Sequence, residues 1–202
     1  MINNKAANFG AGILVHWNST LIVDGGFIDN NDLSASPTFG YGGGIYTAAG
    51  ANLEIKNGTI ISNNKAKYGA GGRTEYKTSN IIQDGTIIRN NTAVSSGGGL
   101  YFGSGTYLGA GTISIGAAII ENNTANFGAG LDFGRGFTIM INGADILNNS
   151  SLTSDGAIYT YPQNILSLSN CLLNNNDAQY GGAVYIGSAE NTGTATTLTL
   201  LK

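Results

Sequence analysis

The stretches IRNNTAVSSGGGL (residues 88–100) and IENNTANFGAGL (residues 120–131) decide the fold, because both place an Asn pair ahead of a small-residue cluster. The same Asn pair, preceded by an aliphatic residue two positions earlier, recurs along the chain. The first residues of the pairs are Asn3, Asn30, Asn63, Asn90, Asn122, Asn148 and Asn174, at spacings of 27, 33, 27, 32, 26 and 26 residues. Self-similarity at such a period is typical of a repeat architecture.

The small-residue cluster is the second landmark of each repeat, and it usually follows the Asn pair by six or seven residues. The clusters are Gly10-Ala11-Gly12-Ile13, Gly42-Gly43-Gly44-Ile45, Gly69-Ala70-Gly71-Gly72, Gly97-Gly98-Gly99-Leu100, Gly128-Ala129-Gly130-Leu131, Asp155-Gly156-Ala157-Ile158 and Gly181-Gly182-Ala183-Val184. Glycine permits a positive φ and close backbone approach, so each cluster predicts a tight corner.

Short stretches of alternating apolar and polar residues lie between these landmarks, such as Leu53 to Lys56 and Thr112 to Ile115. A period of two indicates strands with inward aliphatic and outward polar side chains. A unit of about 27 residues cannot bury its own apolar face, so neighbouring units must stack. We therefore predict an all-β fold, a right-handed parallel β-helix of about seven coils spaced about 4.8 Å apart.

The Asn pairs have a structural explanation within this fold. Asn tolerates left-handed backbone conformations at tight bends, and its amide can bond to the Asn above and below it. We expect a structural ladder formed by Asn30, Asn63, Asn90, Asn122, Asn148 and Asn174. The longer spacings place insertions near residues 33–41 and 104–111, which we expect to project as loops.

Composition narrows the functional classes. Only 10% of the 202 residues are charged, against roughly 25% in an average soluble domain, while Gly (32) and Asn (25) are abundant. The net charge of −3, with nine scattered Lys and Arg residues, argues against a nucleic-acid partner. No apolar run is long enough to span a membrane, and residues 1–20 lack a signal-peptide pattern, so we expect any export signal to lie outside this segment.

The repeat motifs resemble those of a known group of surface proteins. Gly181-Gly182-Ala183-Val184 matches a GGA[ILV] tetrapeptide, and Phe27-Ile28-Asp29-Asn30 matches FxxN. Residues 60–63, 87–90 and 119–122 fit FxxN with Ile in place of Phe. Together the motifs are similar to the repeats of chlamydial polymorphic outer-membrane proteins and related surface β-helix proteins of the pectin-lyase-like type. The resemblance implies a right-handed parallel β-helix, an extracellular or cell-surface location, and a role in adhesion.

A candidate binding face follows from aligning the strands that begin at the Gly clusters. The position two residues after the last small residue should point outward, and it is often aromatic. It holds Leu14 and then the six proposed binding residues Tyr46, Arg73, Tyr101, Asp132, Tyr159 and Tyr185. Stacked aromatic rings could bind a glycan or a host or cell-surface protein. The alternative is a purely structural column, because Tyr favours exposed strands and aromatic pairs stabilise sheets.

An enzymatic role is the second hypothesis, a pectate-lyase-like or polygalacturonase-like cleavage of polysaccharide. Such enzymes need two or three converging acids. Only Glu75, on the same coil as Arg73, and Asp132, two coils away, are placed near this face, and the alternative is that both are solvated surface charges. We therefore predict no catalytic residues, no metal site for the lone His16 and no cofactor.

The ends of the chain also carry an expectation. Residue 2 already lies inside a repeat, and residues 197–202 read as a strand. Open solenoid ends expose apolar core and unpaired backbone. We expect residues 1–202 to form a single β-helix domain, a segment of a longer surface protein whose ends are covered by adjoining parts of that chain or by a capping partner.

Overall fold

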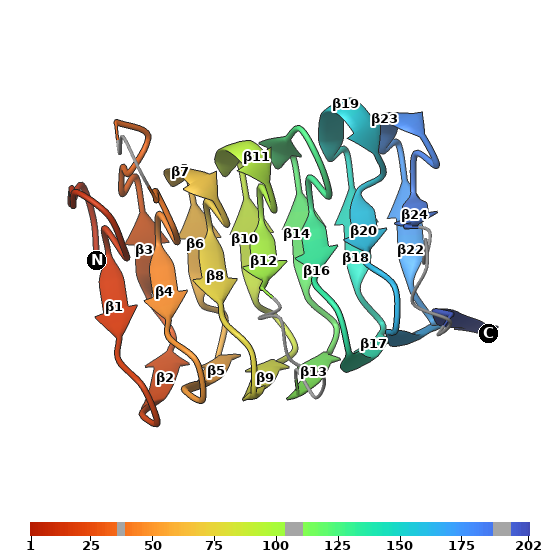
Figure 1. Cartoon of the computed structure of the whole chain (residues 1–202), viewed down its shortest axis with the longest axis horizontal. Helices are drawn as coiled ribbons and strands as arrows, with labels where there is room; N and C mark the ends of the chain where they lie inside the picture. Colours follow the sequence, from red (N-terminus) through yellow and green to blue (C-terminus); the bar gives the residue numbers. More distant parts are fainter. Residues whose placement is uncertain (36–38, 104–110, 188–194) are drawn as a thin grey trace.

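A computed structural model describes residues 1–35, 39–103, 111–187 and 195–202. These residues contain 25 strands and no helix, and the strands form four sheets in which every pairing is parallel. Each strand pairs with its equivalent one coil further along, so the chain winds as a right-handed parallel β-helix of seven coils (Figure 1). The predicted fold class is confirmed.

Two sheets flank the Asn pair of each repeat: the strands of sheet A precede the pair, and those of sheet B follow it. Sheet A contains β3 (Phe27–Asp29), β6 (Ile60–Ser62), β10 (Ile87–Arg89), β14 (Ile119–Glu121), β18 (Asp145–Leu147) and β22 (Leu172–Asn174). Sheet B, beyond the Asn corner, contains β7 (Lys65–Tyr68), β11 (Thr92–Ser96), β15 (Thr124–Ala125), β19 (Ser150–Asp155) and β23 (Asp177–Tyr180).

The other two sheets follow the Gly clusters. Sheet C, nearest the viewer in Figure 1, contains β1 (Ile13–Val15), β4 (Ile45–Thr47), β8 (Gly72–Thr74), β12 (Leu100–Phe102), β16 (Leu131–Phe133), β20 (Ile158–Thr160) and β24 (Val184–Ile186). Sheet D contains β2 (Thr20–Asp24), β5 (Asn52–Lys56), β9 (Thr78–Ile82), β13 (Gly111–Ile115), β17 (Phe137–Asn142), β21 (Ile165–Ser169) and β25 (Thr197–Leu201).

Aliphatic side chains from sheets A, C and D meet in one continuous core. Ile61, Ile88 and Ile120 come from the middle strands of sheet A, and each is fully buried. A smaller core under sheet B is built mainly from alanines, including Ala66 and Ala93. The large side chains therefore fill the body of the coil, and small ones fill its tight corner.

The amide ladder belongs to the second Asn of each pair, which corrects the prediction. Asn64 Nδ2 donates to Asn91 Oδ1 at 3.0 Å, and Asn91 Nδ2 donates to Asn123 Oδ1 at 3.0 Å. Each backbone N–H of the ladder also donates to the next Asn oxygen. The complete ladder is Asn4, Asn31, Asn64, Asn91, Asn123, Asn149 and Asn176.

The first Asn of each pair forms the left-handed bend instead. Of the residues predicted as the ladder, Asn30, Asn63, Asn90, Asn122 and Asn148 have φ between 52° and 55° and exposed side chains. The bend turns the following side chain inward, which is why the neighbouring residue carries the buried ladder. In the last coil Asn174 pairs with Leu147, so Asn175 makes the bend and Asn176 joins the ladder.

In the middle coils, glycine at the third position of a Gly cluster is required by close packing between coils. A Cβ on Gly71 would collide with the carbonyl oxygen of Gly99 and would lie 3.2 Å from the ladder amide of Asn91. Gly99 stands in the same relation to the carbonyl oxygen of Gly130. The Gly clusters thus let the start of sheet C approach both the next coil and the Asn ladder.

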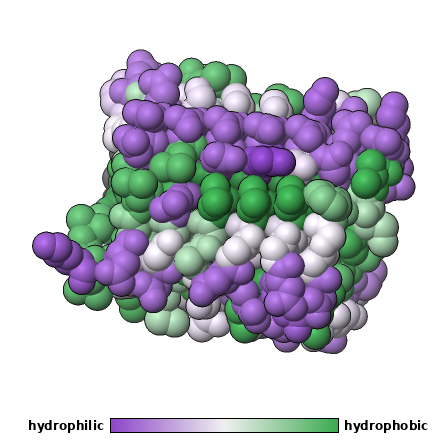
Figure 2. All heavy atoms as spheres, turned by 180° about the vertical axis from the view of Figure 1, so that it is seen from behind, coloured by the Kyte–Doolittle hydropathy of each residue, from purple (hydrophilic) through white to green (hydrophobic). Residues whose placement is uncertain are grey.

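The two insertions predicted from the longer repeats lie partly in the described chain. Residues 36–38 and 104–110 lie outside the described residues, so both predicted loops are only partly described. Where the first insertion is described, Leu33 is buried and Phe39 packs on Phe9. The outer face of sheet A, for which no prediction was made from the sequence, is largely apolar. It carries an apolar stripe, seen as the green row in Figure 2, whose register column is Phe27, Ile60, Ile87, Ile119, Asp145 and Leu172.

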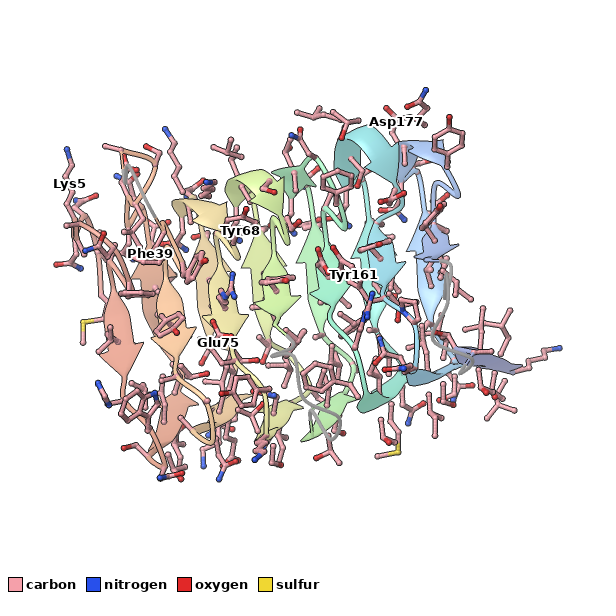
Figure 3. All side chains as sticks on the ribbon, viewed as in Figure 1. Lys5, Phe39, Tyr68, Glu75, Tyr161 and Asp177 are labelled. Carbon is pink, nitrogen blue, oxygen red and sulfur yellow. The ribbon has the colours of Figure 1, made fainter. Side chains whose placement is uncertain are left out.

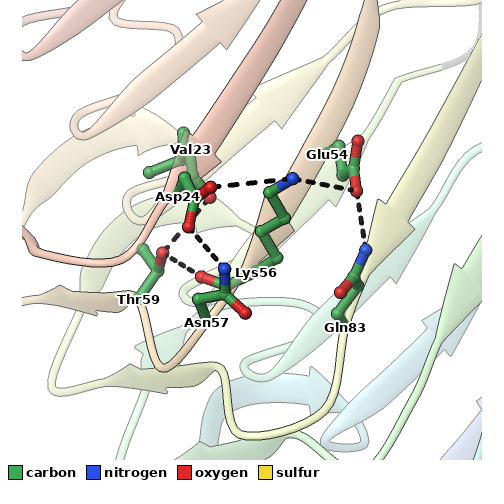
Figure 4. Close-up of polar contacts among 7 residues, drawn as sticks. All are labelled: Val23, Asp24, Glu54, Lys56, Asn57, Thr59 and Gln83. Carbon is green, nitrogen blue, oxygen red and sulfur yellow. Dashed lines mark hydrogen bonds and ion pairs between the residues drawn. The ribbon is translucent and has the colours of Figure 1, made fainter.

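Polar side chains also link coils on the outer face of sheet D (Figure 4). Lys56 Nζ lies 3.7 Å from Asp24 Oδ2 and 3.9 Å from Glu54 Oε1. Asn57 Nδ2 donates to Asp24, and Gln83 Nε2 donates to Glu54. These partly exposed ion pairs contribute at most about 1 kcal/mol each, so the buried core and ladder dominate stability.

Candidate binding site

The six residues of the predicted binding column lie in one register on sheet C. Strand pairing aligns Tyr46 with Arg73, Arg73 with Tyr101, and Tyr101 with Asp132. It continues from Asp132 to Tyr159 and from Tyr159 to Tyr185. The sequence alignment therefore placed all six side chains on the outer face of the same sheet.

A second, mainly aromatic column beside the first was missed by the sequence analysis. It consists of the residues directly before the first glycine of each corner, namely Phe9, Tyr41, Tyr68, Ser96, Phe127, Asp155 and Tyr180. Phe9 pairs with Tyr41, and Tyr41 with Tyr68. The signal was present, because an aromatic residue precedes five of the seven clusters, but the alignment started only at the glycines.

Rings of the two columns pack against one another across the Gly corner. Phe9 and Tyr46 have ring centroids 4.9 Å apart, and Tyr68 and Tyr101 have centroids 6.2 Å apart. Phe39 stacks on Phe9 at 5.3 Å, which adds a ring from the first insertion. Figure 3 shows Phe39 and Tyr68 on this side of the molecule. The two columns form one surface, which we call the aromatic face.

Tyrosines further along sheet C extend the aromatic face. Tyr159 stacks on Tyr185 at 5.7 Å and meets Tyr161 edge-on at 4.8 Å. Burial is the main reason why the pKa of Tyr159 lies above its ordinary value, and the neighbouring Tyr161 raises that pKa further. The hydroxyls of Tyr159 and Tyr161, whose pKa values are both raised, therefore stay protonated and can donate hydrogen bonds at neutral pH.

Arg73 and Glu75 form the polar centre of the aromatic face. Arg73 Nε donates to Glu75 Oε1 at 2.8 Å, and the two side chains are only 11% and 14% exposed. The guanidinium carbon lies 3.8 Å from the ring centroid of Tyr41 and 4.6 Å from that of Tyr101. Tyr46 Oη also donates to Glu75 Oε1 at 3.3 Å. The cation is thus held between two rings and an acid, and these charges are not freely solvated as one sequence hypothesis allowed.

Asp132 departs most from its predicted role. The alignment made it an exposed binding residue, but its side chain is fully buried, and neither carboxylate oxygen has a hydrogen-bond partner of good geometry among the described residues. Burial raises the pKa of Asp132 well above its ordinary value, and the charge of Asp155 raises it further. The nearby Ser96 hydroxyl and Arg73 guanidinium partly oppose this rise. Asp132 therefore lies beneath the aromatic face and cannot contact a ligand directly.

Two further findings concern possible metal sites and membrane-spanning helices among the described residues. In the described ranges, no three His, Cys, Asp or Glu side chains converge as a metal site would require. No helix there is long and apolar enough to cross a membrane. The lone Cys171 packs partly buried against the main core, as expected for a small apolar side chain.

Comparisons with protein families, with curated proteins and with solved structures found no match to this chain.

Proposed function

We propose that this chain is a non-catalytic, surface-exposed β-helix module that binds an extracellular glycan through the aromatic face. The observation that carries the proposal is the pair of interlocked columns on one side of a rigid solenoid. Half-exposed rings recur along both columns, and the cation–acid pair of Arg73 and Glu75 lies between them. A row of flat apolar rings with polar edges suits sugar rings, which also combine apolar faces with hydroxyl groups.

An extracellular location, with an adhesin-like or scaffolding role, is part of the same proposal. Few charges, many Asn and Gly residues, and motifs similar to those of surface β-helix proteins support it. A solenoid suits this role because its extended face repeats the same kind of contact along its length. Binding of a cell-surface protein instead of a glycan is a second outcome that the test below separates.

Burial of Asp132 favours binding over cleavage. An acid that protonates a glycosidic oxygen must reach the substrate, and the Asp132 oxygens are covered. Glu75, the next acid of the face, is held by Arg73 and by the hydroxyl of Tyr46. Product analysis of any bound polysaccharide tests this point. Release of oligosaccharides that stops on Glu75→Gln or Asp132→Asn would replace the binding proposal with an enzymatic one.

The test of binding is a double substitution, Tyr159→Ser with Tyr185→Ser. These two rings stack on each other at the surface and, unlike Tyr101, are not packed against Arg73. Losing two stacking contacts of about 1 kcal/mol each should weaken binding about thirtyfold. The measurement is a glycan array followed by titration of the best ligand by calorimetry.

The matched control is Phe27→Ser, which removes an aromatic ring that is 57% exposed on sheet A, away from the aromatic face. Its binding should equal that of the unchanged chain. Equal affinity of the double variant and the unchanged chain for every glycan bound would refute the proposal. Binding only to cell-surface proteins would assign the face to a protein partner.

A further inference from the structure

The outer face of sheet A lies on the opposite side of the molecule from sheet C (Figures 1 and 2). It carries the apolar stripe, in which Phe27 is 57% exposed and Leu172 is 52% exposed. Ile60, Ile87 and Ile119 lie between them in the same register and are half-buried. A continuous row of partly exposed apolar side chains marks an interaction surface. The groups beside the stripe determine which partner fits it.

A second outward column runs beside the stripe, two residues further along each strand of sheet A. It consists of Asp29, Ser62, Arg89, Glu121, Leu147 and Asn174. The carboxylate of Asp29 accepts hydrogen bonds from Ser62 Oγ at 2.6 Å and from Asn63 Nδ2 at 2.8 Å. Arg89 and Glu121 are half-buried register neighbours, yet neither side chain has an ion pair or hydrogen bond among the described residues. Two opposite charges beside the stripe therefore remain available to a partner.

The order of these two charges suits a second copy of the same chain. A two-fold axis that runs along the strand direction, midway between β10 and β14, reverses the order of the coils in the partner. It places Arg89 of each copy opposite Glu121 of the other, so that two equivalent ion pairs form. Moving the axis by half a coil would instead bring Arg89 onto Arg89 or Glu121 onto Glu121. Charge complementarity thus selects one register.

The same register brings the apolar stripes of the two copies together. Ile87 lies over the partner's Ile119, and Phe27 lies over the partner's Leu172. The turns that lead into β3 and β6 leave room for a second sheet, because a Cβ added to Gly26 or Gly58 would meet no atom within 4 Å. Two sheets can therefore pack face to face at their usual separation of about 10 Å.

We propose that sheet A is a homodimer interface, in which two copies pack their apolar stripes face to face and exchange Arg89–Glu121 ion pairs. Five coil steps make this contact only about 24 Å long, and it is three residues wide, so the dimer is weak and depends on concentration. The aromatic face stays open, because sheet C lies on the other side of each copy. The dimer is therefore independent of the proposed glycan binding.

Sedimentation equilibrium of the 202-residue chain over a range of concentrations tests the dimer. The unchanged chain should follow a monomer–dimer equilibrium. Ile87→Arg should weaken the dimer about tenfold or more, because it buries an unpaired charge against the partner's Ile119 twice in each dimer. Ile81→Arg is the matched control, since Ile81 is 41% exposed on the outer face of sheet D, and it should dimerise like the unchanged chain. An unchanged chain that stays monomeric, or equal association of the two variants, would overturn the proposal.

Charge exchange tests the register. Arg89→Glu and Glu121→Arg should each weaken the dimer about three- to tenfold, because each brings like charges together at two places. The chain with both substitutions restores opposite charges across the interface, and its dimer should return toward the strength of the unchanged one. A double variant that dimerises no better than the single variants would refute this register.

Asp145 gives a test with the opposite sign. It is the one charged residue of the stripe, and the proposed register places it opposite the partner's Ile60. Asp145→Leu should therefore strengthen the dimer about tenfold or more, because an apolar contact replaces a carboxylate at two places. The measurement is again sedimentation equilibrium, and a dimer that is unchanged or weaker in this variant would contradict the proposed packing.

Discussion

Asp132 is an acid that the fold holds in unfavourable electrostatic surroundings. Its carboxyl group is fully buried behind the aromatic face, without a well-formed hydrogen bond among the described residues, and close enough to Asp155 for their charges to interact. Arg73 is the cation that opposes this repulsion. An acid in such surroundings binds a proton more tightly in the folded chain than in the unfolded one.

The consequence is a loss of stability as the pH rises. Between the ordinary pKa of 3.8 and its raised folded value, Asp132 holds more proton in the folded state, so the free energy of unfolding falls through that window. Asp132→Asn removes this contribution. At neutral pH the variant should be more stable than the unchanged chain by about 1–3 kcal/mol, and near pH 3 the difference should vanish. Urea unfolding of both chains from pH 3 to 8 measures this, and a variant that is less stable at pH 7 would contradict it.

Single residues also show where sequence reasoning reached its limit. Tyr46 and Tyr159 were assigned correctly to one outward column, because alternation along a strand fixes the direction of a side chain. Burial of Asp132 could not be read in the same way, because alternation gives the direction of a side chain and not the extent to which its surroundings cover it. The ladder was placed one residue early, and two residues early in the last coil, because neighbouring Asn residues all suit a corner and only the backbone conformation distinguishes them.

At the scale of elements, the Asn corner between sheets A and B combines a left-handed bend with a buried amide ladder. Asn90 makes the bend with φ of 55° and has an exposed side chain, whereas Asn91 is fully buried. Asn91 Oδ1 accepts both the backbone N–H and the side-chain amide of Asn64. The two neighbouring residues therefore stabilise the corner by different means.

Substitutions at this corner should separate the two roles. Asn91→Ala leaves two buried donors of Asn64 without an acceptor and should cost about 2–5 kcal/mol. Asn90→Ala should cost about 1–2 kcal/mol through left-handed strain, and Asn90→Gly less than that. Thermal and chemical unfolding of the three variants gives the order. Equal losses for Asn91→Ala and Asn90→Ala would show that the ladder does not stabilise the fold.

The strands and corners were the features of this molecule that the sequence predicted best. The strands at residues 52–56 and 111–115 follow directly from alternating side chains, and the Gly corners follow from the need for close approach. The second column of the aromatic face was not predicted, because its residues precede the corner and lie outside the alternating stretches. The apolar stripe on sheet A was missed for a related reason, since Ile60 and Ile87 sit next to inward aliphatics and read as one apolar run.

For the whole molecule, stability and function both depend on equivalent residues lying over one another. The outward column of sheet D that contains Thr20, Thr112, Thr138 and Ile165 shows this plainly, because these exposed residues share one register across six coils. Their separations in space should be whole multiples of the coil spacing. The aromatic face and the ladder both require that regularity.

Spin labels in this column test the stacking most directly. One label is placed at Thr20 and the second at Thr112, Thr138 or Ile165, in a chain carrying Cys171→Ala, and the distance between labels is measured by double electron–electron resonance. The backbone separations are three, four and five coils, so the account predicts distances that increase in equal steps of about 4.8 Å, from about 14 to about 24 Å. Distances that fail to rise in equal steps of about 4.8 Å would contradict it.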